Sequence, residues 1–243
     1  MRMYFPGELA PGRACALPPP QAHHAVRVLR LKVGDAVILF NGDGAEYAAV
    51  IVVINRDRFA LDVTGCERVD REAPLAVTLA QAVSSGERMD YTVQKAVELG
   101  VARIEPVVMH RGVVRLDPER ARQKQAHWQA VAVAACEQCG RNRLPEIAPV
   151  RRFDEWLAQW RRRSPAAFGV LLDPGAARRL ADLPRPAGGI TLLAGPEGGY
   201  SDDERQVAQR AGCVPVRLGP RVLRTETAAL SALAAMQALW GDY

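Results

Sequence analysis

The chain has 243 residues, of which 49% are hydrophobic and 24% are charged, and its formal net charge is +5. This length is enough for one large domain or two modest ones. No apolar run reaches the roughly 18 residues of a membrane-spanning helix, and the amino terminus lacks the apolar stretch of a signal peptide. The five scattered cysteines favour a reduced protein, so a cytoplasmic location without a membrane anchor is expected.

Residues 1–70 predict a small β-rich domain. The segment after residue 17 begins with three prolines and then offers one or two helical turns. The turn sequences NGDG and NRDR separate three apolar or alternating runs, at 35–40, 46–54 and 59–67. The expected fold is a small β-barrel. The polar, proline-containing stretch 67–76 is the expected linker.

Residues 74–243 predict a second domain in which strands alternate with helices. The expected strands are 75–83, 103–109, 168–173, 189–195 and 213–219. The expected helices are 87–100, 117–140, 201–212 and 225–240. This alternation is typical of an α/β domain with a mainly parallel sheet, in which ligands bind beyond the carboxyl ends of the strands.

Positive charge is concentrated in the middle of the chain. Residues 1–72 hold nine basic and nine acidic side chains, whereas residues 103–163 hold thirteen basic and seven acidic ones. Most of the basic residues are arginines, which bind phosphate in a bidentate manner and stack on bases. The stretch therefore suggests a polyanionic partner such as RNA, and a solvated basic surface is the alternative.

Three loops that contain Gly and Pro follow predicted strands, and together they could line one pocket. They are DPGA (173–176), GPEGGYSDDE (195–204) and GPRVLRTET (219–227). The middle loop matches neither a P-loop nor a dinucleotide fingerprint, and Ser201 with Glu204 predicts a capping box at a helix start. Its four acids disfavour a phosphate and favour a cationic or neutral ligand, such as a sulfonium, an amine or an adenosine.

Two further features bear on binding and assembly. The CEQC sequence at 136–139 has no second ligand pair, so core cysteines on a helix are expected, and no metal site. From Thr227 to Trp240, eleven of fourteen residues are Ala, Leu, Met or Trp. A helix that is apolar on nearly all faces must be buried, either in the core or against a second subunit, and a homodimer is the favoured interpretation.

Several motifs closely resemble the RsmE family, the bacterial small-subunit rRNA uridine-N3 methyltransferases of the SPOUT superfamily. The most specific are LLAGPEGGYSDDE (192–204) and VRLGPRVLRTETAAL (216–230). Similar blocks are HHAVRVLRLKVGD, ERMDYTVQKAVELGV, EPVVMHRGVVR and ACEQCGRNRLPEI, so the resemblance covers nearly the whole chain. Ser85 departs from the pattern, because many members have a lysine there.

The resemblance implies a PUA-like N-terminal barrel and a SPOUT-type α/β domain with a deep trefoil knot, although protein chains are generally unknotted. It also implies S-adenosylmethionine as cofactor, bound in a bent form by the three loops, and a homodimer in which the partner completes each pocket. The cofactor-binding residues carried over from the family are Leu172, Gly195, Glu197, Gly198, Leu218, Gly219, Leu223, Arg224 and Thr227.

Methylation of uracil N3 requires loss of the N3 proton and stabilisation of negative charge on O2 or O4. Arg224 is the expected stabilising group, and Glu197 or Glu226 the expected proton acceptor. Phosphates of 16S rRNA would contact Arg27, Arg30, Arg111, Arg141 and Arg143. Two alternatives remain open, namely a SPOUT enzyme for another rRNA or tRNA base and a non-catalytic rRNA-binding assembly factor.

Overall fold

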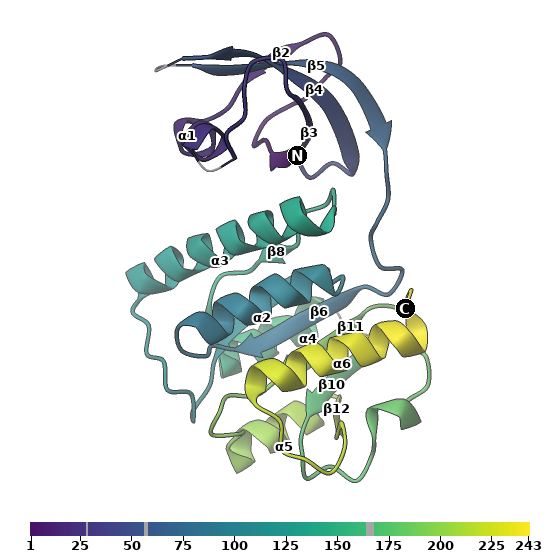
Figure 1. Cartoon of the computed structure of the whole chain (residues 1–243). Helices are drawn as coiled ribbons and strands as arrows, with labels where there is room; N and C mark the ends of the chain where they lie inside the picture. Colours follow the sequence, from purple (N-terminus) through teal and green to yellow (C-terminus); the bar gives the residue numbers. More distant parts are fainter. Residues whose placement is uncertain (28, 56–57, 164–167) are drawn as a thin grey trace. The chain divides into compact units, whose positions relative to one another are not determined.

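The computed structural model describes residues 1–27, 29–55, 58–163 and 168–243 and contains two compact units (Figure 1). Unit 1 comprises Met1–Glu72 and Cys136–Leu144. Unit 2 comprises Ala73–Ala135 and Pro145–Tyr243. The division differs from the expected one in one respect, because residues 136–144 group with the N-terminal unit rather than with the α/β unit.

Unit 1 is built on a five-stranded sheet with the order β1-β3-β4-β5-β2. Its elements are β1 (Arg2–Tyr4), β2 (Ala14–Ala16), α1 (Pro19–Arg27), β3 (Ala36–Phe40), β4 (Ala45–Ile54) and β5 (Phe59–Arg68). Side chains alternate between buried and exposed along β4, as expected for a strand with one face on a core. That core includes Leu39, Tyr47, Ile51 and Leu61.

The segment 136–144 is attached to unit 1 by buried polar contacts. The Arg141 side chain is 5% exposed and forms an ion pair with Glu72. The Asn142 side chain accepts a hydrogen bond from Arg2 at 2.6 Å and donates one to the Val69 carbonyl at 2.8 Å. These contacts explain why a stretch distant in sequence belongs with the N-terminal sheet.

Unit 2 is an α/β domain whose sheet is entirely parallel among the described residues. Its strands follow the order β12-β10-β11-β6-β7-β8, and β9 also pairs with β7. The strands are β6 (Val77–Ala82), β7 (Arg103–Val108), β8 (Glu146–Ile147), β9 (Arg151–Arg152), β10 (Phe168–Leu172), β11 (Ile190–Ala194) and β12 (Cys213–Val216). The helices are α2 (Glu87–Glu98), α3 (Pro118–Cys139), α4 (Phe153–Arg163), α5 (Asp202–Arg210) and α6 (Thr225–Trp240), with a 3-10 turn η1 (Leu180–Asp182).

Helices cover both faces of this sheet. On one face, α4 and α5 pack on side chains such as Ala80, Leu171 and Leu193. On the other face, α2 and α6 pack on each other and α6 contacts β6 and β11 (Figure 1). β11 is buried at every position and lies between β10 and β6, so it is a central strand of the sheet.

Most expected elements are present, and the structure has six more that were not among them, namely α4, the short strands β1, β2, β8 and β9, and the turn η1. Helix α4 has its buried residues at Phe153, Trp156, Leu157 and Trp160, the spacing of an amphipathic helix. Strands β1 and β2 have three residues each, too few to show a clear alternation. None of the helices in the described ranges is long and apolar enough to cross a membrane. The trefoil knot stays a prediction.

Candidate active site

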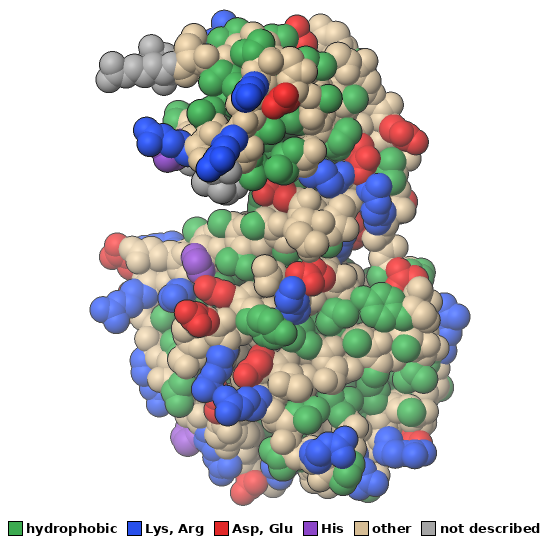
Figure 2. Space-filling model, viewed as in Figure 1, with side chains coloured by type: hydrophobic (Ala, Val, Ile, Leu, Met, Phe, Trp, Pro, Cys, Tyr) green, Lys and Arg blue, Asp and Glu red, His purple; other side chains and the backbone are tan. Residues whose placement is uncertain are grey.

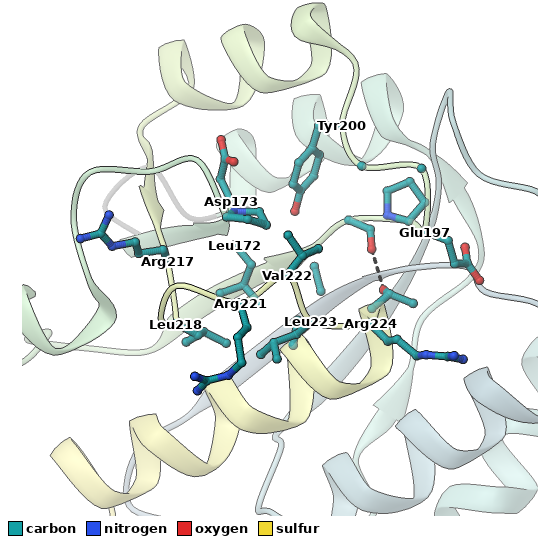
Figure 3. A pocket seen from close by; sticks show the side chains of 18 of the residues that line it. Leu172, Asp173, Glu197, Tyr200, Arg217, Leu218, Arg221, Val222, Leu223 and Arg224 are labelled. Carbon is teal, nitrogen blue, oxygen red and sulfur yellow. Dashed lines mark hydrogen bonds between the residues drawn. The ribbon is translucent and has the colours of Figure 1, made fainter.

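The three Gly- and Pro-containing loops converge at the carboxyl ends of β10, β11 and β12, where they line a cavity of about 600 Å³. Figure 3 shows the apolar side chains of Leu172, Leu218, Val222 and Leu223 in the middle of this cavity, with Arg217, Arg221 and Arg224 pointing outward. The volume is within the range of about 300–1,000 Å³ typical of small-molecule sites. Parallel pairing of the three strands explains the convergence, because their carboxyl ends meet at one edge.

Two glycines of the middle loop are required by the protein's own packing. A Cβ at Gly195 would lie 2.9 Å from the ring of Tyr200, which is buried and donates a hydrogen bond to the Leu193 carbonyl at 2.9 Å. A Cβ at Gly198 would lie 2.9 Å from the backbone oxygen of Arg111. The close approach that the glycine pattern indicates is therefore, at these two positions, an approach of protein atoms.

Thr225, the first residue of α6, connects the middle loop to the sheet. Its hydroxyl donates to the Gly195 carbonyl at 2.6 Å and accepts from the Gln81 side-chain amide at 2.9 Å. Gln81 is fully buried on β6 and also donates to the Ala82 carbonyl at 3.1 Å. A hydroxyl used as both donor and acceptor fixes the start of α6 beside the loop that follows β11.

The capping box predicted for the middle loop is present at the start of α5. Ser201 accepts from the Glu204 backbone at 3.2 Å, and the Glu204 carboxylate accepts from the Ser201 backbone at 2.8 Å. Glu204 also accepts from the backbone of His110 at 2.8 Å, so it ties the loop after β7 to α5. This acid is 7% exposed and serves the scaffold rather than the cavity.

The cavity carries more positive charge than the loop sequence indicates. Its lining includes Asp173 and Glu197 together with Arg88, Arg205, Arg217, Arg221 and Arg224. Asp173 lies 3.1 Å from the Arg205 guanidinium, and Glu197 lies 3.3 Å from that of Arg88. The acids of the middle loop therefore do not set the charge of the cavity alone, because five arginines also line it and two of them pair with its acids.

The expected cofactor-binding residues are distributed over two neighbouring cavities. Eight of the nine line the first cavity, whereas Thr227 lines a second cavity of about 640 Å³. Glu226 also lines the second cavity, and its Oε2 is buried without a hydrogen-bond partner among the described residues. Arg88 lines both cavities. The sequence patterns did not indicate Arg88, since its place on α2 is distant in sequence from the three loops.

The five arginines expected to contact RNA differ in accessibility. Arg27, Arg30, Arg111 and Arg143 are exposed. Arg141 is 4% exposed and paired with Glu72, so the expected phosphate contact is corrected to a structural role within unit 1. Arg103 and Arg163 of the basic stretch also form ion pairs, both with the buried Glu105.

Neither CEQC cysteine belongs to a metal-binding group within the part of the chain that the structure describes. Cys136 is buried, and its burial raises the pKa of the thiol to about 12. Its sulfur lies 3.7 Å from the Arg143 carbonyl, to which it donates. Cys136 is thus a protonated core residue, as the sequence predicts.

Two families of known proteins match this chain and indicate the class of protein to which it belongs. Residues 71–237 match a family described as the RNA methyltransferase domain, and residues 17–64 match the RNA methyltransferase PUA domain. A parallel α/β unit with a cavity at its strand ends, preceded by a PUA domain, therefore defines an RNA methyltransferase of the SPOUT type.

Individual proteins that are similar over almost the whole chain show to which family of RNA methyltransferases it belongs. Ribosomal RNA small subunit methyltransferase E of Buchnera aphidicola is 31% identical, with 99% of this chain and 97% of that protein aligned. The enzyme of the same name from Neisseria gonorrhoeae, solved with S-adenosylmethionine, is 40% identical with a TM-score of 0.91 over 100% of this chain and 98% of that one. A Legionella pneumophila methyltransferase structure with bound SAM has 40% identity and a TM-score of 0.94 over the same shares. The chain belongs to the RsmE family.

Proposed function

We propose that this protein transfers a methyl group from S-adenosylmethionine to N3 of a uridine in the 16S rRNA of the small ribosomal subunit. The observation that carries the proposal is the cavity at the ends of β10, β11 and β12, lined by GPEGG and LGPRVLRTE residues. Proteins that are similar over nearly the whole chain were solved with this cofactor. We also propose a cytoplasmic location, because the ribosomal substrate is found there.

The residues present fit S-adenosylmethionine. The apolar side chains of Leu172, Leu218 and Leu223 offer a surface for an adenine ring. The carboxylates of Asp173 and Glu197 suit an amino group or a sulfonium, and the surrounding arginines suit the ligand's carboxylate. When bound, the cofactor supplies an electrophilic methyl group attached to a positively charged sulfur.

The protein's own groups must accept a proton and face negative charge. Glu226 is the better placed acceptor, because its Oε2 is buried without a hydrogen-bond partner in the described residues while Glu197 is paired with Arg88. Arg224 is exposed, immediately precedes the first turn of α6 and lines the cofactor cavity. Its guanidinium can therefore face an oxygen of the target base. Removal of the N3 proton and stabilisation of the resulting charge are thus assigned to neighbouring residues of one helix start.

Assembly as a homodimer is part of the proposal. Outside its buried stripe α6 carries apolar side chains that are at least partly exposed, namely Leu230, Ala234, Ala235 and Leu239. Figure 2 shows hydrophobic side chains at the surface over this helix. Covering these side chains in a dimer removes apolar surface from water, which favours association. Sedimentation velocity of the wild type and of Leu239→Arg tests this, with a shift toward monomer expected for the variant.

The proposed function is tested by calorimetry with S-adenosylmethionine and by methyl transfer to small subunits that lack the modification. The Ala228→Trp substitution places a large side chain on the cavity wall, so loss of cofactor binding and of transfer is expected. Ala102→Trp is the matched control, because Ala102 is exposed and precedes β7 at the opposite ends of the strands. Equal cofactor binding by both variants would place the cofactor elsewhere.

The two alternatives have distinct outcomes in the same assays. Mass spectrometry of rRNA from a deletion strain would show loss of one 3-methyluridine if the proposal is right. Loss of another modified base, or of a tRNA modification, would identify a different SPOUT activity. Binding to small subunits without methyl transfer would indicate an assembly factor.

A further inference from the structure

The second cavity, next to the cofactor cavity, has no assigned occupant. It measures about 640 Å³ and is lined by residues of α2, α3 and the start of α6, namely Glu87, Arg88, Asp90, Tyr91, Gln94, Val131, Glu226 and Thr227. Arg88 lines both cavities, so the two cavities lie on either side of this side chain. A group held in the second cavity would therefore lie beside a ligand in the first.

We propose that this second cavity is the subsite that receives the flipped uracil, with Tyr91 as its stacking platform and Arg88 as the cation that faces a uracil oxygen. This inference rests on the proposed function and specifies where the substrate base is held. Tyr91 is 51% exposed although it is a large aromatic residue. Enzymes that modify bases extrude them from the stack and hold them against aromatic side chains.

The polar lining matches the edge of uracil. That edge presents an acceptor, a donor and an acceptor, at O2, N3–H and O4. The cavity offers donors from the guanidinium of Arg88 and the amide of Gln94, and an acceptor from the carboxylate of Glu226. Glu226 Oε2 is buried and lacks a hydrogen-bond partner among the described residues, which is costly unless a ligand donates to it.

Two other acids line this cavity, namely Glu87, which is exposed, and Asp90, which already has partners. Asp90 accepts from the Trp128 indole at 3.1 Å and lies 2.8 Å from His127 Nε2. Glu226 is thus the acid of this lining with an unsatisfied buried oxygen. In the proposed step the N3 proton passes to the Glu226 carboxylate, and the negative charge left on the ring spreads over O2, N3 and O4, where Arg88 faces it.

The stacking role is tested with Tyr91→Ala, Tyr91→Phe and the control Tyr243→Ala, which truncates another exposed tyrosine of the same unit. Tyr91→Ala should lower kcat/KM for small-subunit methylation about tenfold or more, as loss of base stacking does in other nucleic-acid sites. Tyr91→Phe, which keeps the ring, should retain most of the activity that Tyr91→Ala loses, and Tyr243→Ala should stay near wild type. All four proteins should bind S-adenosylmethionine equally in calorimetry and sediment alike.

Three results would overturn this subsite. They are wild-type methylation by Tyr91→Ala, an equal loss in Tyr91→Phe, and a parallel loss of cofactor affinity. Dissociation of a dimer by Tyr91→Ala would instead make the surface a contact between copies of the chain. A wild-type protein that binds cofactor but methylates nothing would contradict the proposed function itself and remove the uracil as occupant.

The role of Arg88 is tested by the pH dependence of single-turnover methyl transfer. The charged groups around it are Glu87, Asp90 with its partner His127, Glu197 and Glu226. Because a cation beside the ring favours loss of the N3 proton, Arg88→Gln should move the rising limb of the profile to higher pH, and Arg88→Lys should restore it. A uniform loss of rate at every pH, with no shift of the limb, would show that Arg88 only supports the structure.

Discussion

The Thr225 hydroxyl donates to the carbonyl of Gly195 at 2.6 Å, which joins the first turn of α6 to the loop after β11. The same hydroxyl accepts from Gln81 of β6. Residues 30 positions apart in sequence are thereby fixed in one wall of the cofactor cavity. The Thr225 side-chain oxygen thus links two segments of this wall.

Thr225→Val should weaken both stability and cofactor binding. The substitution keeps the shape but leaves the Gly195 carbonyl and the Gln81 amide without this partner, at a cost of about 1–3 kcal/mol in the free energy of unfolding. Chemical denaturation measures that loss, and calorimetry should show about tenfold weaker binding of S-adenosylmethionine if about 1.4 kcal/mol is lost from the bound state. Thr225→Ser, which keeps the hydroxyl, should recover most of both. Thr227→Val is the control. An equal decrease in its free energy of unfolding would contradict a stabilising role of the two Thr225 hydrogen bonds.

Gly169→Ala should destabilise the centre of unit 2. A Cβ at Gly169 would lie 2.8 Å from the Trp160 ring and 2.9 Å from the Cys213 sulfur. Overpacking of this kind costs about 1–3 kcal/mol. Gly188→Ala is the matched control, because no atom lies within 4 Å of its added Cβ. Thermal unfolding of the two variants should separate them, and equal melting temperatures would show that α4 moves aside freely.

Glu105 should make the stability of the protein depend on pH. Burial alone would raise its pKa, but hydrogen bonds from Trp156, Arg163 and Arg103 outweigh burial, and the pKa of the folded state is lowered. A lowered pKa means that the stabilisation is complete above the unfolded-state pKa of about 4.3 and is lost as pH falls through the folded-state value. Unfolding free energies measured from pH 6 to 3 should therefore fall more steeply for wild type than for Glu105→Gln. Parallel curves would contradict this assignment.

Arg141→Ala and Arg143→Ala should have different effects although the residues are two positions apart. Arg141 is buried with Glu72, so its loss should lower the free energy of unfolding by about 2 kcal/mol, less than for a fully buried pair because Glu72 is 22% exposed. Arg143 is exposed, so its loss should leave stability within about 0.5 kcal/mol.

The two variants also separate in RNA binding. If Arg143 contacts a phosphate, Arg143→Ala should reduce the slope of log affinity against log salt by about one. Filter binding to small-subunit rRNA across salt concentrations measures this slope. Arg141→Ala should leave it unchanged in the folded protein, and the reverse pattern would return Arg141 to the RNA interface.

Much of the candidate site is predictable from the sequence because the fold is periodic. Loops after predicted parallel strands meet at one edge of a sheet, and for this reason strand–helix alternation is enough to assign GPEGG and LGPRVLRTE to one cavity. The Ser201–Glu204 capping box is predictable too, since it depends on residues three positions apart. Helix α4 carries an equally clear apolar spacing, so its absence from the expected elements reflects an overlooked pattern rather than a missing one.

Other features depend on contacts between distant segments and were not predictable. Arg88 on α2 contacts Glu197, which lies 109 positions later in the sequence. The packing of α2 beside α6 brings the two residues together. Basic composition suggested RNA contact for Arg141, whereas packing against Glu72 buries it. A glycine in a loop indicates that another group approaches the backbone closely, but the sequence does not show whether that group is a ligand or another part of the protein.

The sequence by itself determined the two-domain order and the loops that form the cavity, because these follow from strand–helix alternation, and the resemblance of its motifs to a known family determined the class of protein. Only the tertiary structure decided which charges face that cavity, that Tyr200 and Arg111 occupy the space beside Gly195 and Gly198, and that a second cavity adjoins the first at Arg88. The physical reason is that burial and charge pairing are set by side chains brought together from distant segments, which a local pattern does not encode.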